Sequence, residues 1–467
     1  MVIFNPKRPL KKGESAAFVE MAALPENGRD INRVDEKIFT GGGSKFANKD
    51  TLFARITPCL ENGKTSLVSG LSDGEVAFGS TEFIVLAAKE PEYDSDYIYY
   101  LSRLGEFRSF ARSRMEGTSG RQRVAWQSLA DYEYDFPDKR LRKFAGDVLK
   151  KFDDKILLNH QINHTLEQMA QALFKSWFVD FEPVKAKITA LEAGGSQEDA
   201  MLAAMTAISG KDSDALVVFE REHPEQYAQL KATAELFPSA MQESEGRDIP
   251  KGWAVVKTEE LTSKIGMGPF GSNIKVSTFV DEGIPIISGQ HLKESILNDG
   301  ENNFITLEHA DKLKSSNVFS EDIIFTHAGS IGQVSIIPEF SEYERYVISQ
   351  RQFFLRADKK LISPYYLLYF FRSRTGQHLL LSNASQVGVP SIARPSSHLK
   401  NIELVAPDFK LVKKFEDHCK TIINGVVQRK KQTVLLKNIR DTLLPKLLSG
   451  EITLPEAEQA VSEAENV

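Results

Sequence analysis

The chain has 467 residues, enough for two to three domains of ordinary size. Its hydrophobic content of 41% and charged content of 26% are those of a globular protein, which excludes a chain that is disordered throughout. Because 64 acidic residues outnumber 58 lysines and arginines and give a net charge of −6, any surface that binds nucleic acid must be a local patch.

The distribution of cysteines and apolar residues narrows the class of protein further. Cys59 and Cys419 are far apart in the sequence, which argues against a disulfide scaffold and against a cysteine-based zinc site. No apolar run reaches the roughly 18 residues that a membrane-spanning helix needs. The N-terminal segment also lacks the hydrophobic core of a signal peptide. We therefore expect a soluble, cytoplasmic protein.

Taken in chain order, the sequence predicts an α+β fold in which two mixed α/β domains are each followed by a long helix. Short apolar runs rich in β-branched and aromatic residues, broken by Gly, Asn, Asp and Pro, predict the strands of the mixed domains. Apolar residues spaced by threes and fours predict the helices. The expected segments are a first mixed domain at 1–138, a long helix at 139–184, a helical insertion or linker at 185–249, a second mixed domain at 250–408, a second long helix at 409–452 and an acidic tail at 453–467.

The two mixed domains and their helices match each other at an offset of about 270 residues, too long for the period of a solenoid. The matches keep the same order in both halves, so we interpret the chain as a tandem duplication. The matching pairs are Asp50–Phe53 with Asp322–Phe325, Ser80–Leu86 with Gln350–Leu355, Asp96–Leu101 with Pro364–Tyr369, Pro137–Asp138 with Pro407–Asp408, and Leu173–Phe178 with Leu443–Leu448.

The long helices are predicted from a narrow apolar stripe that continues for thirty-odd residues in each half. At about 1.5 Å per residue each helix is a rod of roughly 50 Å. A stripe this long predicts a coiled coil, most simply the two helices packed on each other, with one slip in the periodicity near Asn159. The residues expected at the helix and partner interface are Phe152, Ile156, Leu166, Leu173, Trp177, Phe178, Val426, Ile439, Leu443 and Leu447.

A search for catalytic motifs gives only weak matches. Gly63-Lys64-Thr65 ends like a phosphate-binding loop, but Pro58 stands where the first glycine should be. His160 and His164 have a metal-ligand spacing, yet no third ligand accompanies them. Asn5-Pro6-Lys7 lacks the second proline and the aromatic residue of an amino-methyltransferase loop, and Pro137-Asp138 starts a helix. We expect a chain with no catalytic residues, no metal and no cofactor of its own.

Positive charge is concentrated in loops at matching places of the two halves. Gly and Ser allow a backbone to approach phosphates, while Arg and Gln can reach base edges in the major groove, so these loops favour DNA binding. A solvated turn with incidental arginines is the alternative for each loop taken singly. The candidate DNA-binding residues are Arg112, Arg114, Gly117, Thr118, Ser119, Gly120, Arg121, Arg123, Ser272, Asn273, Lys275, Arg372, Arg374, Ser385, Gln386 and Arg394.

Two recognition domains on a long rod would read two separate DNA half-sites with an unread gap between them. Two other classes of protein remain as alternatives. A self-sufficient nuclease or methyltransferase would need a nucleotide or S-adenosylmethionine fingerprint. A coiled-coil scaffold that only assembles proteins would leave the matched basic loops without a role.

The sequence resembles the specificity subunit of type I restriction–modification systems over nearly its whole length. Four segments carry the resemblance, two of which close the long helices. They are Ala172–Phe181, Leu443–Ile452, Gly79–Phe83 and Ile249–Trp253.

The resemblance implies that each mixed domain is a target recognition domain that reads one half of an asymmetric, interrupted DNA sequence. It implies that the two long helices pair antiparallel as a spacer. It also implies that two methyltransferase subunits dock through the helices and bring S-adenosylmethionine, and that two restriction subunits can join and bring ATP- and Mg-dependent cleavage.

The chain departs from the family pattern at its start. The second half has Trp253–Ile265 before its glycine-rich turn, whereas the first half begins near the equivalent turn, at Asn5-Pro6. We expect either a start codon further upstream or a C-terminal tail that substitutes for the residues that usually open such a domain.

Overall fold

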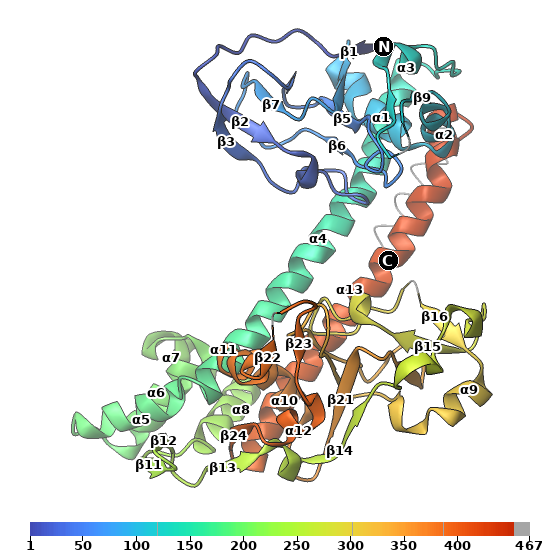
Figure 1. Cartoon of the computed structure of the whole chain (residues 1–467). Coiled ribbons are helices and arrows are strands. Elements are labelled where there is room, and N and C mark those ends of the chain that lie inside the picture. Colours follow the sequence, from blue (N-terminus) through green and yellow to red (C-terminus); the bar gives the residue numbers. More distant parts are fainter. Residues whose placement is uncertain (119, 301, 386, 453–467) are drawn as a thin grey trace. The chain divides into compact units, whose positions relative to one another are not determined.

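The structure is a computed structural model that describes residues 1–118, 120–300, 302–385 and 387–452. The chain divides into two compact units, which are described separately (Figure 1). Unit 1 comprises Met1–Gln161 and the segment from Arg429 onward, and unit 2 comprises Ile162–Gln428. Each unit therefore contains one mixed domain and part of both long helices.

Unit 1 contains two four-stranded sheets with strand orders β1-β8-β5-β6 and β3-β2-β7-β4. The first sheet is antiparallel, whereas β2 and β7 run parallel in the second. A small hairpin, β9–β10, follows the helices α1 and α2. The strands are β1 (Val2–Phe4), β2 (Ser15–Val19), β3 (Asp35–Ile38), β4 (Ser44–Phe46), β5 (Thr51–Ala54), β6 (Thr65–Leu67), β7 (Ala77–Gly79), β8 (Phe83–Ala88), β9 (Met115–Glu116) and β10 (Arg123–Val124), and the helices are α1 (Pro91–Arg103), α2 (Gly105–Ser113) and α3 (Trp126–Ala130).

Unit 2 repeats this topology, with strand orders β14-β21-β18-β19 and β16-β15-β20-β17. The parallel pair recurs as β15 with β20, and the small hairpin recurs as β22–β23. The strands are β13 (Ala254–Lys257), β14 (Thr262–Met267), β15 (Ile284–Ile287), β16 (Asn303–Ile305), β17 (Asn317–Val318), β18 (Ile323–Thr326), β19 (Val334–Ile336), β20 (Tyr346–Ile348), β21 (Gln352–Ala357), β22 (Ala384–Ser385), β23 (Ser391–Ile392) and β24 (Glu403–Ala406), and the helices are α9 (Leu307–Lys312), α10 (Pro364–Arg372), α11 (Arg374–Leu381) and α12 (Pro395–Lys400).

The recurrence of the strand order, of the parallel pair and of the hairpin confirms the predicted tandem duplication. One element has no counterpart. In unit 2, β13 pairs antiparallel with β24. Among the described residues of unit 1, the stretch 133–136 at the place of β24 has no strand partner. An apolar cavity of about 210 Å³ lies beside it, lined by Met1, Phe4, Tyr132 and Phe136 among others.

The long helices are α4 (Lys139–Phe178) and α13 (Phe409–Ser449). They pack antiparallel within each unit: Asp153 meets Arg440 and Asn159 meets Gln432 in unit 1, while Phe174 contacts Phe415 in unit 2. The predicted α+β fold with paired antiparallel helices is confirmed. Whereas the sequence predicted helix over 139–184, α4 ends at Phe178, because Phe181 adopts a left-handed conformation and a new helix follows.

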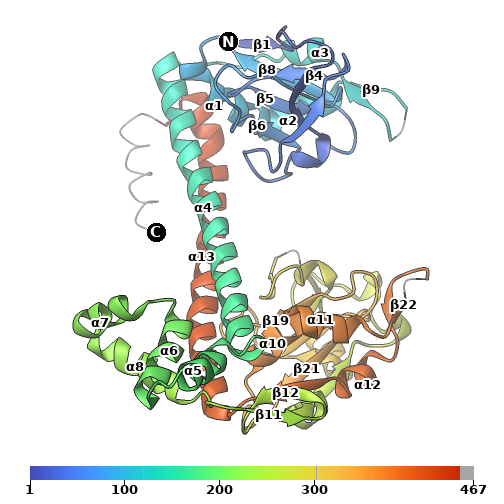
Figure 2. The same cartoon turned by 90° about the vertical axis from the view of Figure 1, so that its left-hand side faces the viewer.

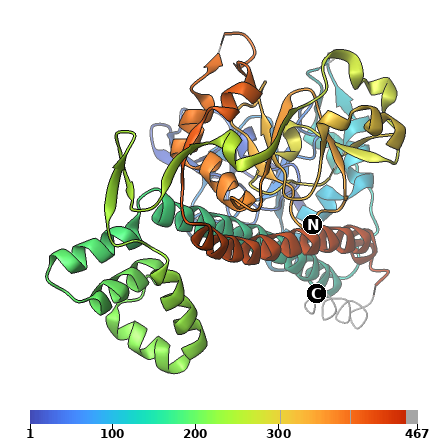
Figure 3. The ribbon, with the colours of Figure 1, turned by 90° about the horizontal axis from the view of Figure 1, so that it is seen from below.

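The insertion between α4 and the second mixed domain folds into four helices and a hairpin, set apart from the sheets of unit 2 (Figure 3). Ser196 and Asp199 form a capping box, and Gly210 ends α6 in the left-handed conformation. A small core of its own includes Met205 and Leu216. The elements are α5 (Glu182–Glu192), α6 (Gln197–Ser209), α7 (Ser213–Glu222), α8 (Pro224–Glu235), β11 (Met241–Ser244) and β12 (Arg247–Pro250).

Candidate nucleic-acid interface

In unit 2, several loops meet at the end of the sheet where β18 stops and β21 starts. The backbone N–H of His327 donates to the carbonyl oxygen of Arg351 at 2.9 Å, and Ile392 N–H donates to His327 O at 2.8 Å. Gly329 N–H donates to Pro390 O at 2.9 Å. These bonds join the β18–β19 loop, the start of β21 and the hairpin β22–β23 into one rigid edge.

Unit 1 forms the same edge with the same backbone bonds. Arg55 N–H donates to Glu82 O at 3.0 Å, Val124 N–H donates to Arg55 O at 3.0 Å, and Thr57 N–H donates to Gln122 O at 3.1 Å. The equivalence makes Glu82 the counterpart of Arg351. It also makes the hairpin β9–β10 the counterpart of β22–β23. Figure 2 shows β9 and β22, each on a hairpin that projects from its own unit.

The two hairpins turn at matching glycines, where the backbone requires the residue type. Gly120 has a φ of 82° and Gly388 a φ of 78°, a left-handed conformation that side chains with a Cβ rarely adopt. The described residues on both sides of these turns, Thr118 and Arg121 in unit 1 and Ser385 and Val387 in unit 2, are exposed. This is the combination that lets a loop follow a phosphate backbone.

Most of the predicted DNA-binding residues are exposed, and those on the hairpins β9–β10 and β22–β23 belong to these edges. Arg114 lies over the ring of Phe110, with 5.0 Å from its guanidinium carbon to the ring centroid. Ser119 and Gln386, as well as the side chain of Ser272, lie outside the described residues. The exposed predicted residues are Arg112, Arg114, Gly117, Thr118, Gly120, Arg121, Asn273, Lys275, Arg374, Ser385 and Arg394.

Arg372 has a different environment from the one predicted. Its side chain is 19% exposed; Nη2 pairs with Glu167 at 2.7 Å and Nη1 donates to Val334 O at 2.8 Å. In unit 1, Arg103 Nη1 points at Thr65 O, the counterpart of that carbonyl, at 3.5 Å. Arg372 therefore ties a helix to the sheet, which favours a structural role, and the DNA contact predicted for it stays a prediction.

Arg123 is held by an acidic partner. Glu82 accepts from Arg123 Nε at 3.0 Å and from its Nη2 at 2.8 Å, so the guanidinium is fixed by a bidentate contact. Sequence reasoning missed Glu82, together with Arg55, His327 and Arg351, because a single polar residue next to a strand gives no signal until the backbone register is known.

Buried carboxylates stabilise the opposite ends of the same central strands, away from these edges. Asp50 and Asp322 each precede a central strand, and each accepts an N–H from the residue three positions before it. Burial raises the pKa of both carboxyls above the ordinary value, and the neighbouring guanidinium of Arg8 or Arg356 opposes the shift. The ion pair with arginine offsets the free-energy cost of burying each carboxylate charge.

The predicted helix-interface residues pack inside the two units. Phe152, Ile156, Leu447 and the partly buried Ile439 and Leu443 belong to the core of unit 1, and Trp177, Phe178, Val426, Leu166 and Leu173 to that of unit 2. Trp177 is 1% exposed and its ring meets Phe237 at 5.3 Å between centroids. These side chains join the helices to each other and to the domains, and their contact with an external partner stays a prediction.

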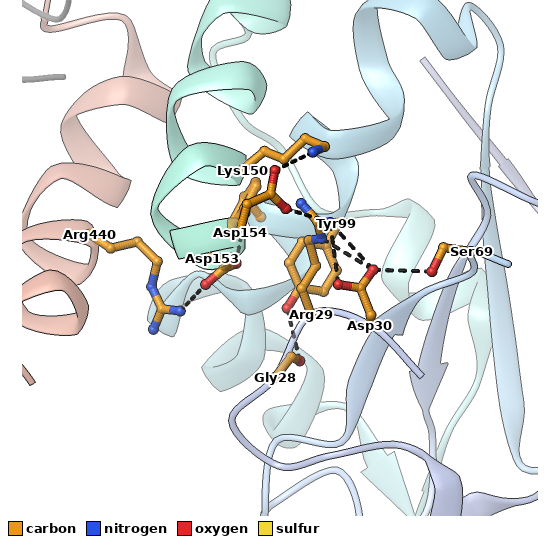
Figure 4. Close-up of polar contacts among 10 residues, drawn as sticks. Gly28, Arg29, Asp30, Ser69, Tyr99, Lys150, Asp153, Asp154 and Arg440 are labelled. Carbon is orange, nitrogen blue, oxygen red and sulfur yellow. Dashed lines mark hydrogen bonds and ion pairs between the residues drawn. The ribbon is translucent and has the colours of Figure 1, made fainter. Parts of the chain in front are cut away.

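Polar contacts fix the helix pair in unit 1 (Figure 4). Asp153 accepts from Tyr100 Oη at 2.7 Å and pairs with Arg440 across the helices. Arg29 pairs with Asp154 at 3.0 Å, which connects the domain to α4. One turn on, the Nδ2 amide of Asn159 donates to Gln432 Oε1 at 2.8 Å, at the place where the sequence periodicity slips.

The helix pair also presents apolar side chains to solvent at this level. Leu157 and Leu158 on α4 are 44% and 46% exposed, and Val434 and Leu435 on α13 are 59% and 43% exposed. Their neighbours Asn159 and Gln432 are bonded to each other, so the four apolar residues lie at one level of the pair. Exposed apolar side chains at one level of a helix pair are candidates for contact with another protein.

The segment Gly63-Lys64-Thr65, one of the weak sequence matches to catalytic motifs, packs against other parts of unit 1. Lys64 donates to Met21 O at 3.2 Å, and the space beside Gly63 is filled by the guanidinium of Arg108. The segment is thus a packed turn. Within the described part of the chain, no group of three or more His, Cys, Asp or Glu residues could hold a metal ion, and no helix is long and apolar enough to cross a membrane.

Two tandem α+β domains, each with a loop-bearing sheet edge and each fused to a shared pair of helices, define a duplicated two-domain protein. The type I restriction enzyme HindI specificity subunit of Haemophilus influenzae is 30% identical over 424 residues, which cover 89% of both chains. The chain belongs to the family of type I restriction enzyme specificity subunits.

Two further similarities accompany this relationship. The type I restriction enzyme MjaIX specificity subunit of Methanocaldococcus jannaschii is 22% identical over 78% of this chain and 70% of its own. The crystal structure of a type I restriction-modification S subunit from M. genitalium aligns over 94% of this chain and 92% of its own, with 16% identity and a TM-score of 0.45. No family model matches the chain.

Proposed function

We propose that this chain is the DNA-recognition subunit of a type I restriction–modification complex and that it reads a bipartite, asymmetric target. One half of the target is read by the edge of unit 1 that carries β9–β10, and the other by the edge of unit 2 that carries β22–β23. The observation that carries the proposal is the repetition of the same backbone bonds at both edges, each presenting exposed Arg and Gly residues. Membership of the specificity-subunit family supports it.

The long helices serve as the spacer in this proposal. Both α4 and α13 contribute to both units, and buried polar contacts such as Asn159 with Gln432 fix their register. A fixed register gives a fixed number of unread base pairs between the half-sites.

Catalysis belongs to the partners in this proposal. Two methyltransferase subunits dock on the helix pair, for which the exposed Leu157, Leu158, Val434 and Leu435 offer a surface. They bring S-adenosylmethionine, and two restriction subunits bring ATP and Mg. The chain itself contributes no catalytic group, and it acts in the cytoplasm, where its DNA target lies.

A methylation map of the host genome, with and without this gene, tests the proposal. We expect one interrupted adenine-methylated motif to disappear when the gene is deleted. Replacement of both Arg121 and Arg123 by Ala should then relax only the half-motif that unit 1 reads. Equal relaxation of both halves would contradict the assignment of one half to each unit.

If deletion of the gene lowers methylation but removes no particular sequence motif, the result would instead favour a coiled-coil scaffold that assembles proteins and reads no DNA. Salt dependence separates the two functions in vitro. If the loop arginines contact phosphates, each contact removed flattens the log–log dependence of DNA affinity on salt by about 0.9. A scaffold without DNA contacts would show no change of slope.

A further inference from the structure

Arg351 and Glu82 occupy the same place in the two units but carry opposite charge. The carbonyl oxygen of each accepts the equivalent backbone hydrogen bond, from His327 N–H in unit 2 and from Arg55 N–H in unit 1. In unit 1 the acid neutralises Arg123 of the hairpin. In unit 2 the counterpart of Arg123 is Ser391, which faces Ala328 across the same bridge that joins Arg123 to Ile56.

The side chain of Arg351 is exposed, while its backbone is rigid. Gln352, the next residue, is 1% exposed and its Nε2 donates to Thr326 Oγ1 at 3.3 Å. The neighbouring Gln350 accepts from His327 Nε2 through its carbonyl oxygen at 3.1 Å. The segment is therefore held on both sides of Arg351.

The guanidinium of Arg351 lies beside the β18–β19 loop, which is bonded to the hairpin β22–β23. A Cβ built on Gly329 would come 3.6 Å from Arg351 Nη1, so the charged end lies beside Gly329, which bonds to the base of β23. Among the described residues of the chain, Arg351 has no acidic partner within ion-pair distance. An exposed guanidinium on a fixed backbone, with no acidic partner in the part of the chain that the structure describes, is ready to contact a ligand with acceptor atoms.

We propose that Arg351 is a specificity-determining residue of unit 2 and that it reads a guanine in the half-site bound by this unit. A guanidinium matches the O6 and N7 acceptors of guanine with two parallel hydrogen bonds, which is the commonest specific contact in the major groove. In unit 1, Glu82 occupies the equivalent place and holds Arg123 by a bidentate contact. The two halves therefore present different side chains on the same scaffold and read different bases. This inference rests on the proposed function and adds the residue and the base to it.

The test compares methylation maps from cells that carry the complete system with wild type, Arg351→Ala, Arg351→Lys or Lys360→Ala. Lys360 is the matched control, because it is an exposed cation just beyond the other end of β21. We expect Arg351→Ala to relax one guanine in one half-motif, with discrimination against other bases falling by about 5- to 150-fold. Arg351→Lys should restore only part of it, and Lys360→Ala should leave the motif unchanged.

The outcomes separate this inference from the proposed function. An unchanged motif with Arg351→Ala would overturn the assignment of Arg351, whereas the absence of any motif in the wild type would overturn the proposed function itself. A uniform fall in methylation, recovered fully by Arg351→Lys, would identify a phosphate contact and also overturn base reading. If Arg351→Ala abolished methylation, competition between substituted duplexes for the purified complete complex would decide: discrimination lost at one guanine supports the inference, and discrimination retained at every position overturns it.

Discussion

Replacing Asp153 with Ala should destabilise unit 1 strongly, because this carboxylate lies between two buried partners. Asp153 is 8% exposed and the Arg440 side chain 12% exposed, so little water can replace the lost contact. The substitution leaves the guanidinium of Arg440 with only Asp441, which is 63% exposed, and it frees the hydroxyl of Tyr100.

The expected cost follows from these contacts. Breaking a buried ion pair by removing one partner costs about 3–5 kcal/mol, because it leaves an uncompensated charge. Since a change of 1 kcal/mol shifts the melting temperature of a domain of this size by about 2–4 °C, we expect a fall of about 6–20 °C. Asp147→Ala is the matched control on the same helix: its pair with Lys143 is solvent-exposed and contributes at most about 1 kcal/mol.

The assay is a double-mutant cycle of Asp153→Ala and Arg440→Ala, measured by urea unfolding of the full chain. Hydrogen exchange of the segment 139–161 assigns the effect to unit 1. The coupling energy between the two sites should exceed about 1 kcal/mol. If Asp153→Ala costs no more than Asp147→Ala, or if the two substitutions simply add, the polar network does not hold the helices and the reasoning is wrong.

Three further predictions concern other contacts. Arg372→Ala should lower the unfolding free energy of unit 2 by about 1–3 kcal/mol while the recognised DNA sequence stays the same, which a methylation map and a melting curve together would check. Burial lowers the pKa of His418 from its ordinary value of 6.5. As pH falls, the unfolded chain therefore binds the proton first, and stability is lost as pH falls through 6.5 towards the folded pKa. The melting temperature of unit 2 should fall from pH 7 to 5.5, and it should fall less in His418→Gln. Asn159→Ala should cost about 1–3 kcal/mol because the hydroxyl of Thr433, 4% exposed, loses a partner, whereas Leu157→Ala should have a small effect in the same urea unfolding assay.

The domain order and the duplication could be predicted from sequence because both depend on patterns that survive in one dimension. Apolar periodicity distinguishes long helices from strand-rich domains, and repeated short motifs keep their order. The exact alignment of the halves could not. The sequence matched Phe83 with Phe353. The backbone pairing instead makes Phe83 the counterpart of Gln352, because spacing varies in the loops before the strand.

The candidate site was predicted only as a region. The glycines and arginines of the hairpins gave a signal that the structure places on exposed edges, but the contacts of Arg372 with Glu167 and Val334 could not be predicted, because composition does not show which way a side chain points. Its counterpart Arg103 lies at a matching place in the first half, and a pair retained in both halves indicates a role in the shared scaffold. Arg351 has no such counterpart, which is why the same comparison draws attention to it.

The duplication thus separates the scaffold from the residues that differ between the halves. Asp50 and Asp322 accept equivalent backbone hydrogen bonds in the two units. Arg103 and Arg372 lie at equivalent places, as do the hairpin glycines Gly120 and Gly388. At the edge itself, Glu82 is replaced by Arg351 on an unchanged backbone. If both halves read the same bases, nothing would favour a change of charge at this place of a shared backbone. The inversion is the pattern expected of two domains that keep one architecture and read different halves of an asymmetric sequence.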